Sequence, residues 1–338
     1  MLLQRKPDLL IFNTEPQTYS WRGLRLLAFI YLGTLLFAAI IAPPVYWLIA
    51  KWASIAPNDL NSYLSQKDFA DYFDRLRWVP LVLMIVWLIR ASGLRSWRAL
   101  GLHGDQEGRR MSGRGFVIGV GLVLAVAALH VLGTEVQVKG GIDFIKGANI
   151  VVKALAGGLI LGFLEEIVFR GLVFRIFYTA CSPIWALGLS AAFFAYTHFE
   201  MPDAVWDQTS GEVTWSSGFF VGYWTLFGIF VEPDWLLRFI NLTLLGVMLT
   251  LLFLKKRSLM FCVGIHAGIV TTLLLFQKWT RSSEGAHVWL WGSDALIDGL
   301  PALVVLTLLI ILISKRRQPI APSSDKRRAI AQMVHTLR

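Results

Sequence analysis

The chain has 338 residues, of which 56% are hydrophobic and only 16% are charged, and its mean hydropathy is +0.59. Ordinary globular proteins carry about 25% charged and 45–50% apolar residues, so this composition excludes a soluble globular protein, a disordered chain and a collagen-like or disulfide-rich scaffold. The net charge of +10 does not predict a nucleic-acid partner, because the basic residues lie mostly in short stretches between apolar runs, as in cytoplasmic membrane loops. We therefore expect a polytopic membrane protein.

Apolar runs that suit membrane-spanning helices follow one another along the chain. A helix needs about 20 apolar residues to cross a hydrocarbon core of about 30 Å. The runs lie at 25–50, 78–89 (in a helix that starts near Phe69), 115–133, 149–178, 184–204, 236–254, 259–277 and 296–314. These runs predict an all-α fold with about eight transmembrane helices.

The basic residues orient these helices. With the N-terminus inside, most of the 32 Lys and Arg residues lie on the cytoplasmic side, so both termini are predicted to be cytoplasmic. If a ninth apolar run, 215–231, crossed the membrane, it would reverse the orientation of every helix after it. Residues 200–235 contain six acids and no Lys or Arg, which is typical of a non-cytoplasmic loop. We therefore expect 215–231 to be an interfacial or re-entrant segment.

Several ionisable residues lie inside the apolar runs, where each costs at least about 2.5–3.5 kcal/mol on insertion scales and marks a functional hypothesis. Glu166 and Arg170 are spaced i,i+4, which favours an ion pair. Counted along the helices from a turn near Cys181, Glu165 and His198 lie at nearly the same depth, about 25 Å from it. His266 lies nearer the cytoplasmic end of its own helix, so its reach to this pair is less secure.

Small residues lie at helical spacing before Glu166 and before His198, so they form a row on the same helix face as each of these residues. Gly158 and Gly162 precede Glu166 in one run, and Gly188, Ala191 and Ala195 precede His198 in the next. Small residues let membrane helices approach closely. The pattern predicts that these two helix faces pack against each other.

The motifs together resemble a known family. Glu165-Glu166 followed by Arg170, then Phe194 and His198 in an FxxxH pattern, then His266 on a third helix, are similar to the CPBP family of intramembrane glutamic endopeptidases. That family contains type II CAAX prenyl proteases and bacteriocin-processing (Abi) enzymes. The resemblance covers roughly residues 150–275. It implies a multi-pass protein of the cell membrane, most simply a bacterial inner membrane, because Phe169-Arg170-Gly171 fits the bacterial members.

The resemblance also implies a division of the chain. Residues 149–277 are expected to form the CPBP-like catalytic core. Residues 1–148 would supply the first three transmembrane helices and a basic cytoplasmic loop. Residues 278–338 would supply the last transmembrane helix and a basic cytoplasmic tail. The expected partners are the lipid bilayer and a membrane-associated protein or peptide substrate.

The resemblance implies roles for the catalytic side chains. Glu165 is expected to activate water, His198 to orient that water or share its proton, and His266 to donate to the oxyanion. Glu166 would be neutralised by Arg170, and Phe194 would support the site.

The third motif departs from the family pattern. The family usually has Asn or Asp four residues after the third-helix His, and here that residue is Val270, which cannot form a side-chain hydrogen bond. Asn241 on the neighbouring helix or Thr271 is the expected replacement.

Other interpretations of these residues stay open. Zinc would need Glu165, His198 and His266 to converge within about 2.1 Å of one point, and since HExxH is absent, no cofactor or metal is expected. A non-catalytic membrane scaffold, acting in immunity or secretion, is favoured by Val270. A proton-coupled transporter would also bury acids and histidines, but it predicts repeats that the sequence does not show.

Overall fold

The chain forms long helices that suit a membrane. The computed structural model describes residues 6–134, 136–141, 143–199, 212–231, 235–282 and 288–315. Five helices there are long and apolar enough to cross a membrane by length and composition: α1 (Arg22–Ile55), α5 (Gln106–Gly133), the continuous helix Phe144–Ala180, α11 (Trp235–Lys256) and α12 (Leu259–Trp279). The protein is thus an all-α polytopic membrane protein, as its composition predicts.

The continuous helix contains three elements, which are α6 (Phe144–Glu166), the π-helix η2 (Ile167–Val173) and α7 (Phe174–Ala180). The remaining helices are shorter or less apolar. They are η1 (Pro7–Leu9), α2 (Asp59–Ser65), α3 (Phe69–Ala91), α4 (Trp97–Leu100), α8 (Pro183–Tyr196), α10 (Ser217–Phe227), η3 (Gly228–Phe230), α13 (Val288–Trp291) and α14 (Leu300–Lys315). The count of eight spans therefore stays a prediction.

Two of the expected spans are shorter than their apolar runs. α8 ends at Tyr196, well before residue 204, and residues 200–204 lie outside the described part of the chain. α14 begins at Leu300 rather than at residue 296. Hydropathy does not reveal such ends, because local hydrogen bonds set them. The basic tail expected after residue 315 also lies outside the described residues.

The segment 215–231 folds as α10 followed by the short 3-10 helix η3. At 1.5 Å per residue, the 11 residues of α10 extend about 17 Å, which is little more than half of a hydrocarbon core of about 30 Å. Gly218 packs directly on the backbone of Ala39 in α1. This short helix suits the expected interfacial or re-entrant segment.

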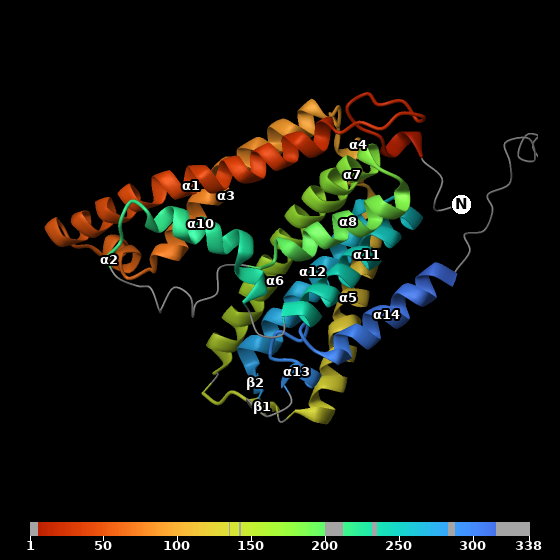
Figure 1. Ribbon diagram of the computed structural model, residues 1–338. Helices are drawn as coiled ribbons and strands as arrows, with labels where there is room; N and C mark the ends of the chain where they lie inside the picture. The colour runs from red at the N-terminus through yellow and green to blue at the C-terminus, as the bar shows by residue number, and fades with distance from the viewer. Residues whose placement is uncertain are drawn as a thin grey trace, which may run out of the picture.

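The helices form two packed groups (Figure 1). α1 and α3 run side by side away from the other helices, with α10 against them. An apolar cluster of their own joins these three helices: Leu35, Ala38, Ala39, Ala42, Phe69, Phe73 and Val221. A larger cluster fills the group that contains α5, α6, α8, α11, α12 and α14.

α12 lies at the centre of the larger group, between α5 and α6. Gly158 and Gly162 of α6 face α12, and a Cβ atom at Gly162 would lie 2.7 Å from the backbone nitrogen of Ala267. On α8, by contrast, Ala191 contacts Gly246 of α11. The prediction that the small-residue rows of α6 and α8 pack against each other is therefore wrong. Each row packs against a later helix, because α12 and α11 carry small residues of their own.

The loops that the charge pattern predicts to be cytoplasmic meet at one end of the fold. Asp8 accepts a hydrogen bond of 2.7 Å from Arg257. The amide of Ser20 donates to the carbonyl of Thr179. At the opposite end, strand β1 (Val136–Val138) pairs antiparallel with β2 (Thr280–Ser282). This ribbon, which the sequence does not predict, links the start of α6 to the end of α12.

Candidate functional site

Three helices bring the four expected catalytic side chains together. Glu165 and Glu166 end α6, His198 follows α8, and His266 lies in α12. The Oε2 atom of Glu165 is 3.5 Å from Nε2 of His198 and 3.6 Å from Nε2 of His266. The Nδ1 atom of His266 is 2.8 Å from Oε1 of Glu166. His266 therefore reaches both carboxylates, although the sequence left its reach less secure.

His198 is held by the end of its own helix. After α8 ends at Tyr196, the hydroxyl of Thr197 and Nδ1 of His198 both bond to the carbonyl of Phe194, at 2.9 and 2.8 Å. A carbonyl oxygen only accepts hydrogen bonds, so Nδ1 carries a proton and donates it. In the neutral imidazole the lone pair is then on Nε2, which faces Glu165. These two side-chain bonds also explain why the helix ends here.

Glu166 is fully buried, and one of its two carboxylate oxygens is paired. Its Oε1 atom accepts 2.7 Å and 2.8 Å hydrogen bonds from Arg170 and from Nδ1 of His266. The Arg170 side chain is only 2% exposed, and it also donates to the carbonyl of Gly246, at 3.4 Å. A buried charge needs such pairing to be tolerated. Glu166 therefore contacts both Arg170 and His266 through the same oxygen atom.

Glu165 has a different environment from its neighbour. Its side chain is 25% exposed, whereas Glu166 is buried. Its Oε2 atom, like that of Glu166, is buried and has no hydrogen-bond partner among the described residues. The separations of 3.5 and 3.6 Å from the two imidazole nitrogens are longer than a usual N–H···O bond of 2.7–3.2 Å. Glu165 is thus the carboxylate that is available for chemistry.

A π-helix follows the two glutamates directly. η2 spans Ile167–Val173 and contains Arg170. π-helical turns are rare and frequently occur at functional sites. The apolar pattern of this run does not distinguish a π-helix from an α-helix, so the sequence predicts only a continuous helix here. The i,i+4 pair of Glu166 and Arg170 forms across the junction.

Phe194 joins the cationic and aromatic parts of the site. Its ring centre lies 4.6 Å from the guanidinium carbon of Arg170, 4.9 Å from the Phe169 ring and 4.4 Å from the His198 ring. Cation–π and edge-to-face contacts of this kind stabilise the arrangement. The ring is buried and provides the packing surface on which the two histidines lie, since His266 is also in ring contact with it.

Sequence reasoning missed Arg238 of α11. Its guanidinium donates a 3.2 Å hydrogen bond to the backbone carbonyl of His198. It also stacks over Phe199, at 4.7 Å from the ring centre. An arginine inside an apolar run was the available signal, and it lies one turn before Asn241.

The two expected replacements for a partner at position 270 do not join the cluster. The side-chain amide of Asn241 donates to the carbonyls of Ile297 and Gly299, at 2.7 and 2.9 Å. The hydroxyl of Thr271 donates to the carbonyl of Ala154, at 3.3 Å. Both side chains therefore bond to backbone between helices. Among the described residues, His266 is oriented instead by Glu166, whose Oε1 atom accepts a hydrogen bond from Nδ1 of His266.

The described His, Cys, Asp and Glu side chains can be compared with the geometry that a metal ion needs. Within the described parts of the chain, no group of three or more His, Cys, Asp or Glu side chains is arranged to hold a metal ion. The three groups that zinc would need are Glu165, His198 and His266.

A comparison with protein families gives a match. Residues 147–272 match the model of a family described as type II CAAX prenyl endopeptidase Rce1-like. The matched segment contains all four clustered side chains, and it confirms the resemblance inferred from the motifs. No curated protein and no solved structure matches the chain.

Proposed function

We propose that this multi-pass membrane protein, whose residues 147–272 match the type II CAAX prenyl endopeptidase family, is an intramembrane endopeptidase. It would hydrolyse a peptide bond of a membrane-associated protein or peptide. The observation that carries the proposal is the position of Glu165, whose Oε2 atom lies within 3.6 Å of Nε2 of both His198 and His266. The catalytic core would be residues 149–277, between N-terminal helices (1–148) and a C-terminal segment (278–338).

In this mechanism Glu165 is the general base. A water molecule bound between Glu165 and His198 would lose a proton to the carboxylate as its oxygen attacks the scissile carbonyl carbon. The lone pair on Nε2 of His198 would accept the second hydrogen bond of this water and so orient it. Glu165 would then pass the proton to the leaving amine, which restores the carboxylate. General acid–base catalysis of this kind typically contributes about 10²–10⁴-fold.

His266 would stabilise the oxyanion of the tetrahedral intermediate. It does this as an imidazolium, donating through Nε2, while Nδ1 remains bonded to Glu166 at 2.8 Å. Glu166 would thus act as a buried acid acts beside a catalytic histidine, because it fixes the orientation of the ring. This pairing offers a reason why Val270 is compatible with catalysis: the ring is oriented from α6 rather than from its own helix.

The test compares Glu165→Gln with Glu107→Gln in purified protein reconstituted into vesicles. The substrate is a peptide anchored to the same vesicles, and the product is measured by mass spectrometry. We expect Glu165→Gln to lower the cleavage rate by at least about 10²-fold and His198→Gln to act in the same direction. Glu107 is exposed at the start of α5, so its substitution should leave the rate unchanged. Unaltered cleavage by the Glu165→Gln variant would refute the mechanism.

A second candidate function is a non-catalytic scaffold of the same fold, and Val270 is the observation that favours it. This candidate predicts that the unaltered protein and the Glu165→Gln variant are equally inactive towards peptides that related peptidases cleave. A zinc-dependent protease is a further candidate, and it predicts that a chelator removes activity.

A further inference from the structure

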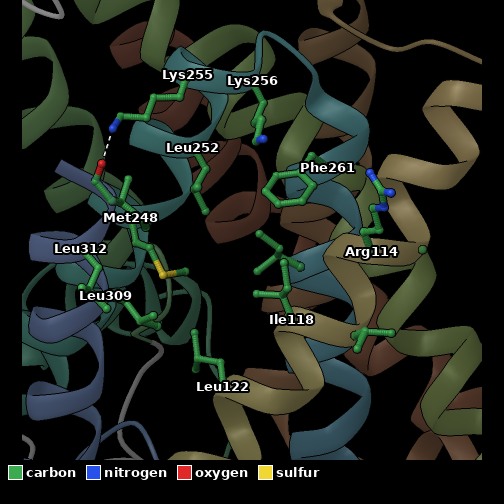
Figure 2. Close-up of a pocket in the computed structure, with 14 residues that line it drawn as sticks. Arg114, Ile118, Leu122, Met248, Leu252, Lys255, Lys256, Phe261, Leu309 and Leu312 are labelled. Carbon is green, nitrogen blue, oxygen red and sulfur yellow. Dashed lines mark hydrogen bonds between the residues drawn. The ribbon is translucent and has the colours of Figure 1, made fainter. Parts of the chain in front are cut away.

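A large groove lies apart from the catalytic cluster, between α5, α11, α12 and α14 (Figure 2). Its volume is about 1050 Å³. α12 separates the two sites: Ile265 lines the groove, while the next residue, His266, bonds to Glu166. Most of the wall is apolar, with Met248 and Leu252 from α11 and Leu309 from α14. Nothing in the proposed peptidase mechanism uses this groove.

The groove has basic side chains at one end only. Arg114, Lys255 and Lys256 lie near the end where α5 begins and α11 finishes, and Leu122 lies at the opposite end (Figure 2). The ammonium of Lys256 lies 5.7 Å from the ring centre of Phe261. Among the described residues that line the groove, none is acidic. The groove is therefore amphipathic, with a cationic rim above an apolar channel.

The groove opens on the lipid-facing side of the bundle. Two of its lining residues, Val117 of α5 and Leu312 of α14, are 70% and 57% exposed. From Arg114 to Leu122, α5 rises about 12 Å, which is close to one leaflet of a hydrocarbon core of about 30 Å. A membrane-spanning helix would need a groove of twice this length. A molecule whose apolar part occupies one leaflet matches the depth.

We infer that this groove binds one anionic phospholipid, taken from the leaflet on the basic side of the protein. The phosphate headgroup would lie against Arg114, Lys255 and Lys256, and the acyl chains would fill the channel towards Leu122. Charge complementarity argues for an anionic rather than a zwitterionic lipid, because basic pockets between membrane helices attract anionic headgroups. Lys255 already donates one hydrogen bond to the carbonyl of Ile313, which holds it at the rim.

The experiment is native mass spectrometry of the full chain in detergent, titrated with phosphatidylglycerol or with phosphatidylcholine of the same acyl chains. We expect phosphatidylglycerol to bind at least about tenfold more tightly. Each basic rim residue should contribute about fivefold, so Arg114→Gln, Lys255→Gln and Lys256→Gln together should lower its affinity on the order of 100-fold. Phosphatidylcholine binding should change little. The conservative set Arg114→Lys, Lys255→Arg and Lys256→Arg should keep the preference.

Two matched controls separate the groove from the general charge of the protein. Removing Arg95, Arg98 and Arg110, which are exposed and do not line the groove, should keep the preference. Ile118→Trp should weaken binding of both lipids by filling the channel, whereas Leu124→Trp on the exposed face of the same helix should not. Ile118→Trp alters no rim charge, so it tests the site even if the triple Gln variant does not fold.

Three results would overturn the inference. The first is equal binding of the two phospholipids, and the second is a preference for phosphatidylglycerol that survives loss of the three rim charges. The third is loss of that preference in the control set, Arg95, Arg98 and Arg110. Tighter binding of a lipidated peptide than of phosphatidylglycerol, lost in the same rim variant, would assign the groove to a protein ligand instead.

Discussion

Replacing Glu166 by glutamine should destabilise the protein far more than the same change at Glu165. Glu166 is 0% exposed, and its partner Arg170 is 2% exposed, so the substitution leaves a buried guanidinium without a counter-charge. Breaking a buried pair by removing one partner costs about 3–5 kcal/mol. The amide oxygen of glutamine still accepts a hydrogen bond, which places the expected cost near the lower end. The Glu165 side chain is 25% exposed and lies 3.5 and 3.6 Å from its two imidazole neighbours, so Glu165→Gln should change the free energy of unfolding much less.

A double-mutant cycle measures the pair itself. Arg170→Met alone leaves the Glu166 carboxylate buried without its cation, and we expect a cost of about 3–5 kcal/mol. Glu166→Gln combined with Arg170→Met removes both charges, so the double variant should lose much less stability than the sum of the two single changes. We expect a coupling energy of at least about 1 kcal/mol, within the range of residues in direct contact.

The chain provides its own reporter of unfolding. Cys262 lies one turn before His266 in α12 and is fully buried, so a thiol-reactive dye labels it only when α12 becomes exposed. Cys181 is partly exposed, and a Cys181→Ser background removes its signal. The midpoint of labelling on heating should fall for Glu166→Gln and change much less for Glu165→Gln. Equal midpoints for the two glutamate variants, or additive effects in the cycle, would contradict the assignment of Glu166 as the structural carboxylate.

Three further predictions concern packing, the oxyanion and metal. Gly162→Leu should unfold the protein, seen as rapid labelling of Cys262 in the thiol assay, because even a Cβ atom would lie 2.7 Å from the backbone nitrogen of Ala267. The control Gly188→Leu should be tolerated, since a Cβ atom at Gly188 meets nothing within 4 Å. Val270→Asn should change the cleavage rate by less than about tenfold, because Glu166 already orients His266; a gain of 10²–10³-fold, the usual worth of one oxyanion donor, would show that the donor was missing. Incubation with EDTA should leave cleavage intact, and loss of activity that zinc restores would favour the metal-dependent alternative.

The sequence predicts the long helices well, because their apolar runs are continuous. α11 and α12 begin and end within about two residues of the expected runs at 236–254 and 259–277, which is the usual uncertainty of helix ends. The end of α8 was missed because it depends on two side-chain bonds to the carbonyl of Phe194, not on hydropathy. The β1–β2 ribbon was missed because three-residue strands carry no periodic signal.

The part of the site that depends only on how far each residue lies along its helix could be predicted from the sequence. Equal distances along two helices placed Glu165 near His198, and the structure has them 3.5 Å apart. The bond between His266 and Glu166 was not predictable, because it depends on how closely α6 and α12 approach at their glycines. The role of Asn241 was not predictable from its mid-span position, because the direction of its side chain depends on the loop before α14, whose carbonyls it binds.

The β1–β2 ribbon has a consequence for how a substrate enters. The ribbon connects the start of α6 to the end of α12 through backbone pairing. Closer to the site, Gly158 and Gly162 of α6 pack against the backbone of α12. Glu165, Glu166 and His266 therefore belong to one rigid unit. His198 lies just after α8, where its Nδ1 atom bonds to the carbonyl of Phe194 and its backbone carbonyl accepts a hydrogen bond from Arg238. A peptide whose scissile carbonyl must reach a water molecule held by Glu165 and His198 is thus expected to displace this turn after α8, with release of the Arg238 bond as the first movement.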